Sequence, residues 1–394
     1  MGGGEGTSEE VQAAERTLRE TWARLGVDPD ARTEVPTGAT VEPPPASVRL
    51  NREALTLDRK IGEGGMGLVF TGVQPGLGRD VAIKLCRRHD AAHEALLVEE
   101  AQVTGGLEHP NILPVYAIAE AKEGRAAIVM KRVRGEPWSE ILAAYDGERN
   151  DDAYLRRHLG ILRQVSLAVA FAHERGVLHR DIKPENVLVG SYGEVYLVDW
   201  GIAVGLSEAA VRPASSVRAI EGTPAYMAPE MAAGDGASLG VHSDVYLLGA
   251  ALYEVLEGEP PHVAPTIQGV LISAFHSRPA EHGAHLPMLA ALANRARASD
   301  PADRFPTAAA FAQALERYEA TRAAQVLSAR GEEKAAVLRE RIAGGAPRRD
   351  IEAAFYEARF AFEQASRELG ENEAVLAGAE RTLESMVRFV LIEG

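Results

Sequence analysis

The chain has 394 residues, of which 46% are apolar and 25% are charged, and its formal net charge at pH 7 is −15. This composition is that of an ordinary globular protein and excludes extensive disorder. The negative charge argues against a nucleic-acid-binding protein, because such proteins need a basic face. The apolar runs are shorter than a bilayer span and the first residues do not resemble a signal peptide, so we expect a cytoplasmic protein with no membrane span in this chain.

The chain contains one cysteine, Cys86, which excludes an internal disulfide and suits a reducing compartment. Because the sequence has no cluster of cysteines and histidines, we do not expect a structural zinc site. We expect the thiol to pack as a small apolar side chain rather than to act as a redox switch.

Residues 1–54 begin with a run of glycines and end in a segment rich in threonine and proline. This composition predicts a flexible acidic arm followed by a proline-rich linker. The stretch from Val11 to Leu25 can form a helix. We expect it to be unstructured or frayed, and docking of this helix on a partner is the alternative.

A glycine cluster, Gly62 to Gly67, lies between two strand-like runs in LTLDRKIGEGGMGLVFTGV. Because Leu68, Val69 and Phe70 are strand formers, we expect a hairpin, whereas a dinucleotide-binding fold would need a helix after the glycines. The glycines have two interpretations at this stage. They form a tight turn, or their backbone amides approach the phosphates of a nucleotide.

The next strand, Asp80 to Cys86, is apolar from Val81 onward except for Lys84 near its end. The alternation of a strand places Ala82 and Lys84 on one face. A buried lysine is costly without an anionic partner, and a phosphate group is a natural one. The alternative is a lysine that reaches water from the end of the strand.

Residues 179–188 read HRDIKPENVL, and such a density of chemical groups predicts a catalytic loop rather than a decorated surface loop. Further along, Asp199 ends the apolar strand in VYLVDWGIA. An aspartate before a glycine can be a simple turn signal. Together with Asn186, however, Asp199 offers the hard oxygen ligands that suit magnesium.

The order of these motifs resembles the protein kinase family, and within it the bacterial serine/threonine kinases of eukaryotic (Hanks) type. The similarity covers roughly Leu55 to Tyr318. It implies an α+β, two-lobed protein kinase fold for residues 55–320, with a β-rich N-lobe and a helical C-lobe. An α-helical module follows over residues 321–394.

The resemblance implies ATP as cofactor together with Mg²⁺, with Mn²⁺ as an alternative metal, and a protein substrate that carries a serine or threonine acceptor. It assigns the ATP contacts to a glycine-rich lid, two strands, a helix carboxylate, a hinge and a residue beneath the adenine. These residues are Ile61, Gly62, Glu63, Gly64, Gly65, Met66, Gly67, Val69, Ala82, Lys84, Glu100, Met130, Lys131, Val133 and Leu188.

By the same resemblance, Asp181 accepts the proton of the substrate hydroxyl and Lys183 contacts the γ-phosphoryl group. Asn186 and Asp199 bind the metal. The partner of Lys84 is Glu100, and the neighbouring Glu99 is the alternative.

Arg180 beside the catalytic aspartate resembles the arginine of kinases whose activation loop is phosphorylated. Ser215 and Ser216 are the candidate sites of autophosphorylation. Thr223 is a third candidate, although we expect it to position the substrate instead.

Three further positions resemble structural residues of the family. Glu230 and Arg304 match a buried ion pair, and Asp244 matches a helix acid that braces the catalytic loop. Trp200 departs from the family, which usually has phenylalanine there, and its indole N–H needs a hydrogen-bond acceptor.

Two other functions compete with a protein kinase. A pseudokinase scaffold would act only by binding, but Lys84, Asp181, Asn186 and Asp199 are all intact. A kinase-fold enzyme that phosphorylates a small molecule is disfavoured by the segment GTPAYMAPE, which resembles a peptide-binding loop.

The C-terminal region shows two apolar stripes at helical spacing, which predict an antiparallel helical hairpin. Packing on the kinase lobe or in a homodimer, docking of a partner protein, and the start of a helical repeat remain open. The first stripe is Ile351, Phe355, Ala358, Phe362, Ala365 and Leu369. The second is Leu376, Ala379, Leu383, Met386 and Val390.

Overall fold

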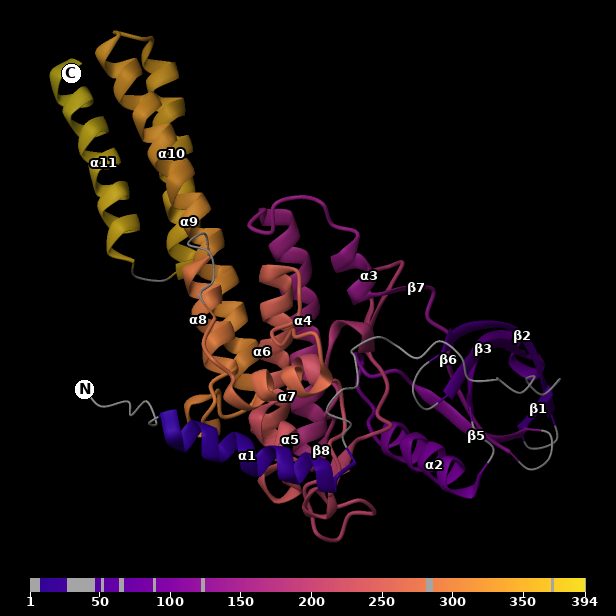
Figure 1. The fold of residues 1–394 in the computed structure, drawn as a ribbon. Coiled ribbons are helices and arrows are strands. Elements are labelled where there is room, and N and C mark those ends of the chain that lie inside the picture. Colours follow the sequence, from indigo (N-terminus) through magenta and orange to yellow (C-terminus); the bar gives the residue numbers. More distant parts are fainter. Residues whose placement is uncertain are drawn as a thin grey trace. The chain divides into compact units, whose positions relative to one another are not determined.

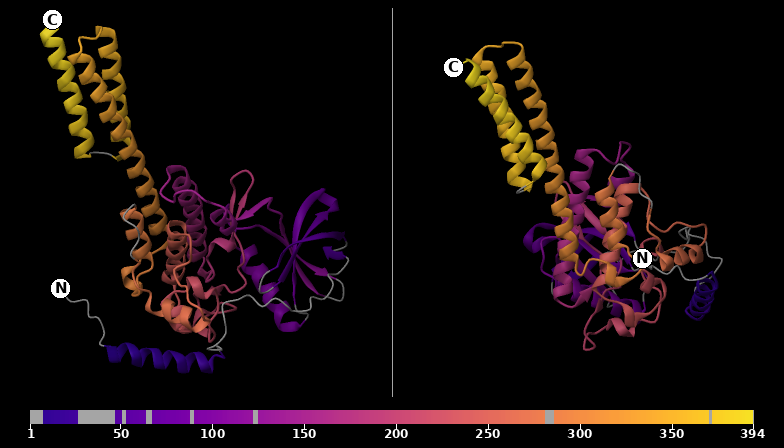
Figure 2. Two further views of the ribbon diagram at one scale, coloured as in Figure 1. Left: turned by 45° about the horizontal axis from the view of Figure 1, so that its top comes forward. Right: turned by 90° about the vertical axis from the view of Figure 1, so that its left-hand side faces the viewer.

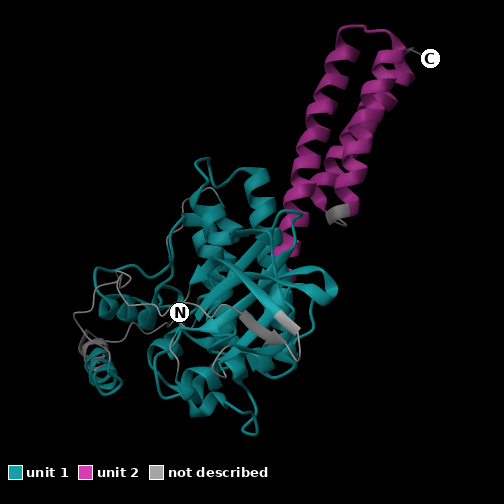
Figure 3. Cartoon of the chain, turned by 90° about the vertical axis from the view of Figure 1, so that its right-hand side faces the viewer, with its two compact units in different colours: residues 1–312 teal, residues 313–394 magenta. Residues whose placement is uncertain are grey.

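Two compact units make up the chain, residues 1–312 and residues 313–394 (Figure 3). The computed structural model describes residues 8–26, 47–50, 53–63, 67–87, 90–121, 125–280, 286–369 and 372–393. No helix in these ranges is long and apolar enough to cross a membrane.

Six antiparallel strands of the first unit close into a barrel in the order β1-β2-β3-β4-β6-β5 (Figure 1). Its interior is filled by alternate apolar residues such as Leu55, Phe70 and Ile83, which are buried. The strands are β1 (Ser47–Leu50), β2 (Glu53–Glu63), β3 (Gly67–Gln74), β4 (Arg79–Cys86), β5 (Val115–Ala121) and β6 (Ala126–Lys131).

One helix, α2 (Ala91–Gly105), packs beside β4, β5 and β6. It begins at Asp90, whose carboxylate accepts a hydrogen bond from the backbone N–H of His93 and so caps the first turn. Its buried face includes Leu97, Glu100 and Ala101. The helix therefore presents one carboxylate to the interior among apolar neighbours.

The remainder of the first unit is mostly helical and lies to one side of the barrel (Figure 2). The expected α+β fold, with a β-rich first lobe and a helical second lobe, is thereby confirmed. At its centre α4 packs against α6, which in turn packs against α8. The helices are α3 (Trp138–Ala143), α4 (Asp152–Glu174), α5 (Pro229–Ala232), α6 (Val241–Glu257), α7 (Ile267–His276) and α8 (Pro287–Ala296).

Short strands hold the loop of residues 179–186 at both of its ends. Before it, β8 (Val177–Leu178) pairs with β11 (Val204–Gly205). After it, β9 (Val187–Gly190) lies between β10 (Val195–Leu197) and β7 (Gly135–Pro137). Because both ends are fixed by backbone hydrogen bonds, the loop has little freedom to move as a whole.

The N-terminal helix α1 (Ser8–Arg24) differs from the mobile arm expected from the sequence. Trp22 is 1% exposed, and its indole N–H donates to the backbone oxygen of Ala232 in α5 at 2.7 Å. His276 of α7 contacts the Glu15 carboxylate at 3.0 Å. Composition could not reveal this docking, because it depends on one buried tryptophan and an acceptor that lies 210 residues away.

The second unit contains three helices in its described part, one more than the hairpin expected from the sequence. It comprises most of α9 (Ala308–Ala343), together with α10 (Arg348–Leu369) and α11 (Glu373–Glu393). Ala335 and Leu338 of α9 join the apolar clusters formed by α10 and α11. Both helices of the expected hairpin therefore pack with a third helix.

The first expected stripe, on α10, is buried from Ile351 to Ala365, while the side chain of Leu369 lies outside the described residues. The second expected stripe is wrong by one position. Leu376, Leu383 and Val390 are exposed, so α11 is rotated by about one residue, or about 100°. The expected stripe and the face that is actually buried share Ala379 and Met386, so the sequence pattern alone distinguishes them poorly. The face that α11 turns inward is Val375, Ala379, Thr382, Met386 and Phe389.

The docking of α1 is tested by Trp22→Ala. Truncation of a buried tryptophan typically costs about 3–5 kcal/mol, and we expect α1 to detach while the rest of the unit stays folded. Limited proteolysis should then cleave within residues 8–26 much faster than in the unaltered chain. Glu20→Gln, an exposed change in the same helix, is the control, and equal cleavage of the two variants would contradict the docking.

Candidate active site

Lys84 of β4 lies in a cluster of three charged groups. Its ammonium contacts both carboxylate oxygens of Glu100, at 2.6 and 2.8 Å, and the Oδ1 atom of Asp199 at 3.2 Å. Lys84 and Glu100 are 8% and 7% exposed. The structure thus pairs Lys84 with Glu100 rather than with Glu99, and it adds Asp199 to the pair.

Burial disfavours the charged form of Lys84, but the two neighbouring carboxylates outweigh burial and raise the pKa of its ammonium. For Asp199, burial would raise the pKa, but the charge of Lys84 more than offsets it, so the pKa of Asp199 is lowered. Both groups are therefore charged at neutral pH. A fixed ammonium next to an anionic carboxylate is suited to binding a phosphate and a cation together.

The expected glycine hairpin is formed by β2 and β3, with Gly62 opposite Val69 and Glu63 opposite Leu68. Gly64, Gly65 and Met66 lie outside the described residues. A Cβ atom added to Gly67 would lie 2.6 Å from the backbone oxygen of Leu85, so glycine is required there for packing alone. At Gly62 the nearest atom would be 3.7 Å away, so packing does not explain that glycine.

The other expected nucleotide contacts lie on or next to neighbouring strands. Ala82 of β4 is opposite Met130 of β6, and Lys131 ends β6 with its ammonium on the hydroxyl of Tyr196. The backbone N–H of Lys131 donates to Pro114 O at 3.0 Å, so this amide is already bonded. The remaining expected nucleotide contacts are Ile61 on β2, Val133 after β6, and Leu188 on β9.

Asp181 is the centre of a second cluster. Its Oδ1 atom accepts a hydrogen bond from the Thr223 hydroxyl at 2.7 Å, and its Oδ2 atom accepts one from the Asn186 amide at 2.8 Å. The Lys183 ammonium lies 3.0 Å from Oδ2 and also contacts the Thr223 hydroxyl. The structure therefore brings Asp181, Lys183 and Asn186 together, as the sequence suggested, and adds Thr223 from a distant segment.

The backbone adopts an unusual conformation at two residues of the site, one in the loop of residues 179–186 and one after β10. Arg180 and Asp199 have φ angles of 69° and 64°, a region that non-glycine residues rarely adopt. The carboxylate of Asp244 accepts hydrogen bonds from the backbone N–H groups of His179 and Arg180, both at 2.8 Å. Asp244 is buried, and these bonds offset the cost of burying its charge and fix the loop.

His179 and Trp200 pack together beneath the site, with ring centroids 4.5 Å apart. His179 is fully buried and contacts the backbone oxygen of Val198, which indicates a structural role. The indole N–H of Trp200 is buried and has no hydrogen-bond partner among the described residues. The acceptor that the sequence led us to expect is therefore missing from the described part of the chain.

The donor groups fit magnesium. Asp199 offers a carboxylate, and Asn186 uses its amide nitrogen on Asp181, which leaves its side-chain oxygen available. Within the described ranges no group of three or more His, Cys, Asp or Glu residues could hold a metal. A site with one carboxylate and one amide oxygen suits Mg²⁺, which usually keeps waters and phosphate oxygens as its other ligands.

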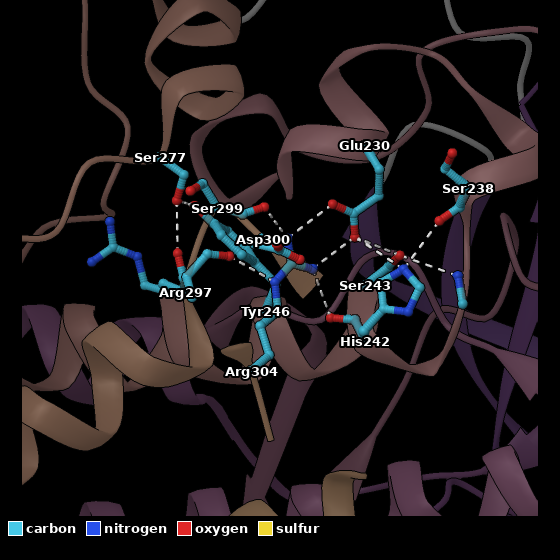
Figure 4. Close-up of polar contacts among 12 residues, drawn as sticks. Glu230, Ser238, His242, Ser243, Tyr246, Ser277, Arg297, Ser299, Asp300 and Arg304 are labelled. Carbon is cyan, nitrogen blue, oxygen red and sulfur yellow. Dashed lines mark hydrogen bonds and ion pairs between the residues drawn. The ribbon is translucent and has the colours of Figure 1, made fainter. Parts of the chain in front are cut away.

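Glu230 and Arg304 form a buried ion pair away from these clusters (Figure 4). The guanidinium donates to both carboxylate oxygens, at 2.8 and 3.0 Å, and also to backbone oxygens of His242, Ala298 and Ser299. Ser243 donates to the same carboxylate at 2.8 Å. Because α5 begins within the last two residues of GTPAYMAPE, the pair and its contacts with His242 and Ser243 tie this segment to the beginning of α6.

Replacing Arg304 by alanine would leave the Glu230 carboxylate buried without its main partner. Such a change typically costs about 3–5 kcal/mol, so we expect a large drop in the free energy of unfolding measured in urea. Arg278→Ala removes an exposed arginine and is the matched control. A loss below about 1 kcal/mol for Arg304→Ala would contradict the structural role.

Two charged residues of this region escaped the sequence analysis. The Glu221 carboxylate contacts Arg180 at 3.0 Å and Arg212 at 2.6 Å. The one available signal was the acidic residue directly before GTPAYMAPE. Its meaning was hidden because Arg212 and Arg180 are brought to it only by the path of the folded segment.

A family model described as protein kinase domain matches residues 55–305. The serine/threonine-protein kinase PknJ of Mycobacterium tuberculosis is 36% identical over 271 residues, which cover 66% of this chain and 44% of that protein.

Two other relatives are also called serine/threonine-protein kinases. PknA of Mycobacterium tuberculosis is 34% identical over 274 residues, covering 68% of this chain and 61% of that protein. PknD of Protochlamydia amoebophila is 36% identical over 235 residues, covering 53% and 23% respectively. The chain thus matches less than two thirds of the length of each of these relatives.

Proposed function

The chain belongs to the protein kinase family, and we propose that it transfers the γ-phosphoryl group of ATP to serine or threonine hydroxyls of proteins. The observation that carries the proposal is the contact between the Thr223 hydroxyl and Asp181, at 2.7 Å. This carboxylate already accepts a hydrogen bond from an aliphatic alcohol. A substrate serine or threonine would present the same chemical group.

Each residue of the site has a defined task in this reaction. Lys84 would bind phosphate oxygens through an ammonium that Glu100 holds in place, and Asp199 and Asn186 would supply oxygen ligands to the metal. Asp181 orients the acceptor hydroxyl and takes its proton late in the transfer. Lys183, 3.0 Å from Asp181, places a positive charge where negative charge spreads in the transition state.

ATP with bound Mg²⁺ would supply the phosphoryl group and neutralise part of its charge. The protein contributes fixed positions, because its charged groups are paired before any ligand binds. Such preorganisation lowers the barrier without covalent chemistry by the protein.

A protein acceptor is supported by the segment from Gly222 to Glu230. Thr223 in this segment contacts both Asp181 and Lys183, so the segment lies directly at the reacting position. The relatives named as serine/threonine-protein kinases support the same class of acceptor. A small-molecule kinase would not need an extended segment at this place.

The same activity would modify the chain itself at Ser215 and Ser216. Ser216 is exposed, and the Ser215 hydroxyl donates to the Glu208 carboxylate at 2.9 Å near the surface. Thr223 is the poorer candidate, since a phosphate there would be repelled by the Asp181 carboxylate. Phosphopeptide mapping after incubation with ATP decides which of the three hydroxyls is modified.

The proposal is tested with Asp181→Asn in a radiolabelled phosphate-transfer assay. Loss of a general base typically lowers the rate by about 10²–10⁴-fold, while the variant should still bind Mg-ATP, as judged by a rise in melting temperature. Asp146→Asn alters an exposed aspartate and is the matched control.

Lys84→Ala, in contrast, should lose both phosphate transfer and the stabilisation by Mg-ATP. Near-normal transfer by Asp181→Asn would contradict the assignment. A chain that binds Mg-ATP but transfers no phosphate even when unaltered would instead be a pseudokinase scaffold.

A further inference from the structure

Arg180 is a buried arginine that lies next to the central carboxylate of the site. It is 2% exposed. Its guanidinium donates to the backbone oxygen of Ile202 at 3.1 Å and to the Glu221 carboxylate at 3.0 Å. A buried guanidinium needs a negative partner, because an unpaired charge is costly in the interior.

Glu221 also binds a second arginine. Arg212 donates to both oxygens of its carboxylate, each at 2.6 Å. Arg212 lies soon after β11, and its backbone oxygen accepts a hydrogen bond from Gly205. One carboxylate therefore joins three places: the catalytic loop at Arg180, the middle of the following segment at Arg212, and the end of that segment.

The segment between Ile202 and Glu221 contains three hydroxyl-bearing residues, Ser207, Ser215 and Ser216. Ser215 is bonded to Glu208 and Ser216 to the backbone oxygen of Pro213. In this fully described segment, no hydrogen bond joins any of these serines to Arg180 or Arg212. The negative charge that the arginines need is already supplied by Glu221.

On the basis of the proposed phosphotransfer activity, we propose that Glu221 is a built-in anion that fixes this segment against the catalytic loop, so that activity does not require phosphorylation of the segment. Phosphorylation of an activation loop supplies negative charge to an arginine cluster. Here the Glu221 carboxylate permanently supplies negative charge to Arg180 and Arg212. Modification of Ser215 or Ser216 is then not needed for activity.

The position of Glu221 in the chain explains how it acts on the site. The next residue, Gly222, has a φ of 111°, and a Cβ atom there would lie 2.9 Å from the backbone oxygen of Arg180. The residue after that is Thr223, which reaches Asp181. Anchoring Glu221 on Arg180 thus sets the distance between the substrate-side segment and the catalytic carboxylate. Glu221 is a positioning residue, since it acts through Arg180 and Thr223.

The test uses the full chain, treated with phosphatase and freed of phosphate as verified by mass spectrometry. A triple variant, Ser207→Ala/Ser215→Ala/Ser216→Ala, prevents modification of the segment during the assay. Into this background we place Glu221→Gln, Glu221→Asp, Arg180→Ala, and the combination Arg180→Ala/Glu221→Gln. A mixture of serine- and threonine-containing peptides is the substrate, and kcat, KM and the melting temperature are measured for each protein.

We expect the triple variant to retain kcat within about twofold of the untreated, unaltered chain. Glu221→Gln should lower kcat about tenfold or more with a smaller change in the KM for ATP, and Glu221→Asp should recover part of the loss, because it restores the charge. In the absence of Arg180, Glu221→Gln should have little further effect. Such non-additivity shows that the two residues act together.

The proposal is overturned if the triple variant is inactive while the untreated chain is active, because phosphate on the segment would then be required. It is also overturned if Glu221→Gln and Arg180→Ala lower kcat independently. If Glu221→Gln fails to fold, the kcat of the triple variant relative to that of the untreated chain decides whether the proposal stands. A complete lack of phosphate transfer by the untreated chain would instead refute the proposed function on which this inference rests.

Discussion

The geometry of the site depends on one buried carboxylate, Asp244. It accepts hydrogen bonds from the backbone N–H groups of His179 and Arg180, and these two bonds fix the conformation of the loop between β8 and β9. The unusual φ of Arg180 is tolerated because the surrounding bonds determine it. Asp181 then points toward Thr223 and Asn186, and the Arg180 side chain points toward Glu221. A side chain of α6 that holds the backbone of the loop therefore determines how the side chains of the loop meet those of residues 221–223.

Electrostatic pairing links the two lobes at Lys84. This lysine of β4 contacts Glu100 of α2 within the β-rich lobe, and Asp199, which follows β10. Asp199 lies 115 residues from Lys84 in the sequence. Because each charge is partly buried, losing one partner leaves the others unbalanced. The position of α2 is thereby coupled, through Lys84, to the position of Asp199.

Much of the site could be foreseen because the motifs are local in the sequence. HRDIKPEN places Asp181, Lys183 and Asn186 within six residues, and an otherwise apolar strand makes Lys84 conspicuous. The family match over residues 55–305 confirms the resemblance to protein kinases. The contacts of Glu221 could not be foreseen, because they depend on how a 20-residue segment folds back. The orientation of α11 was misjudged because two apolar registers one residue apart fit its sequence almost equally well.

The three tryptophans of the chain are all buried, yet each indole N–H has a different environment. In Trp22 it donates to a backbone oxygen of α5, and in Trp138 to the imidazole of His158 at 2.8 Å. In Trp200, beside Asp199, it has no acceptor among the described residues. Because indole emission responds to hydrogen bonding and polarity, the protein carries three intrinsic fluorophores with distinct surroundings. One reports on the N-terminal helix, one on the interior of the helical lobe, and one on the surroundings of Asp199.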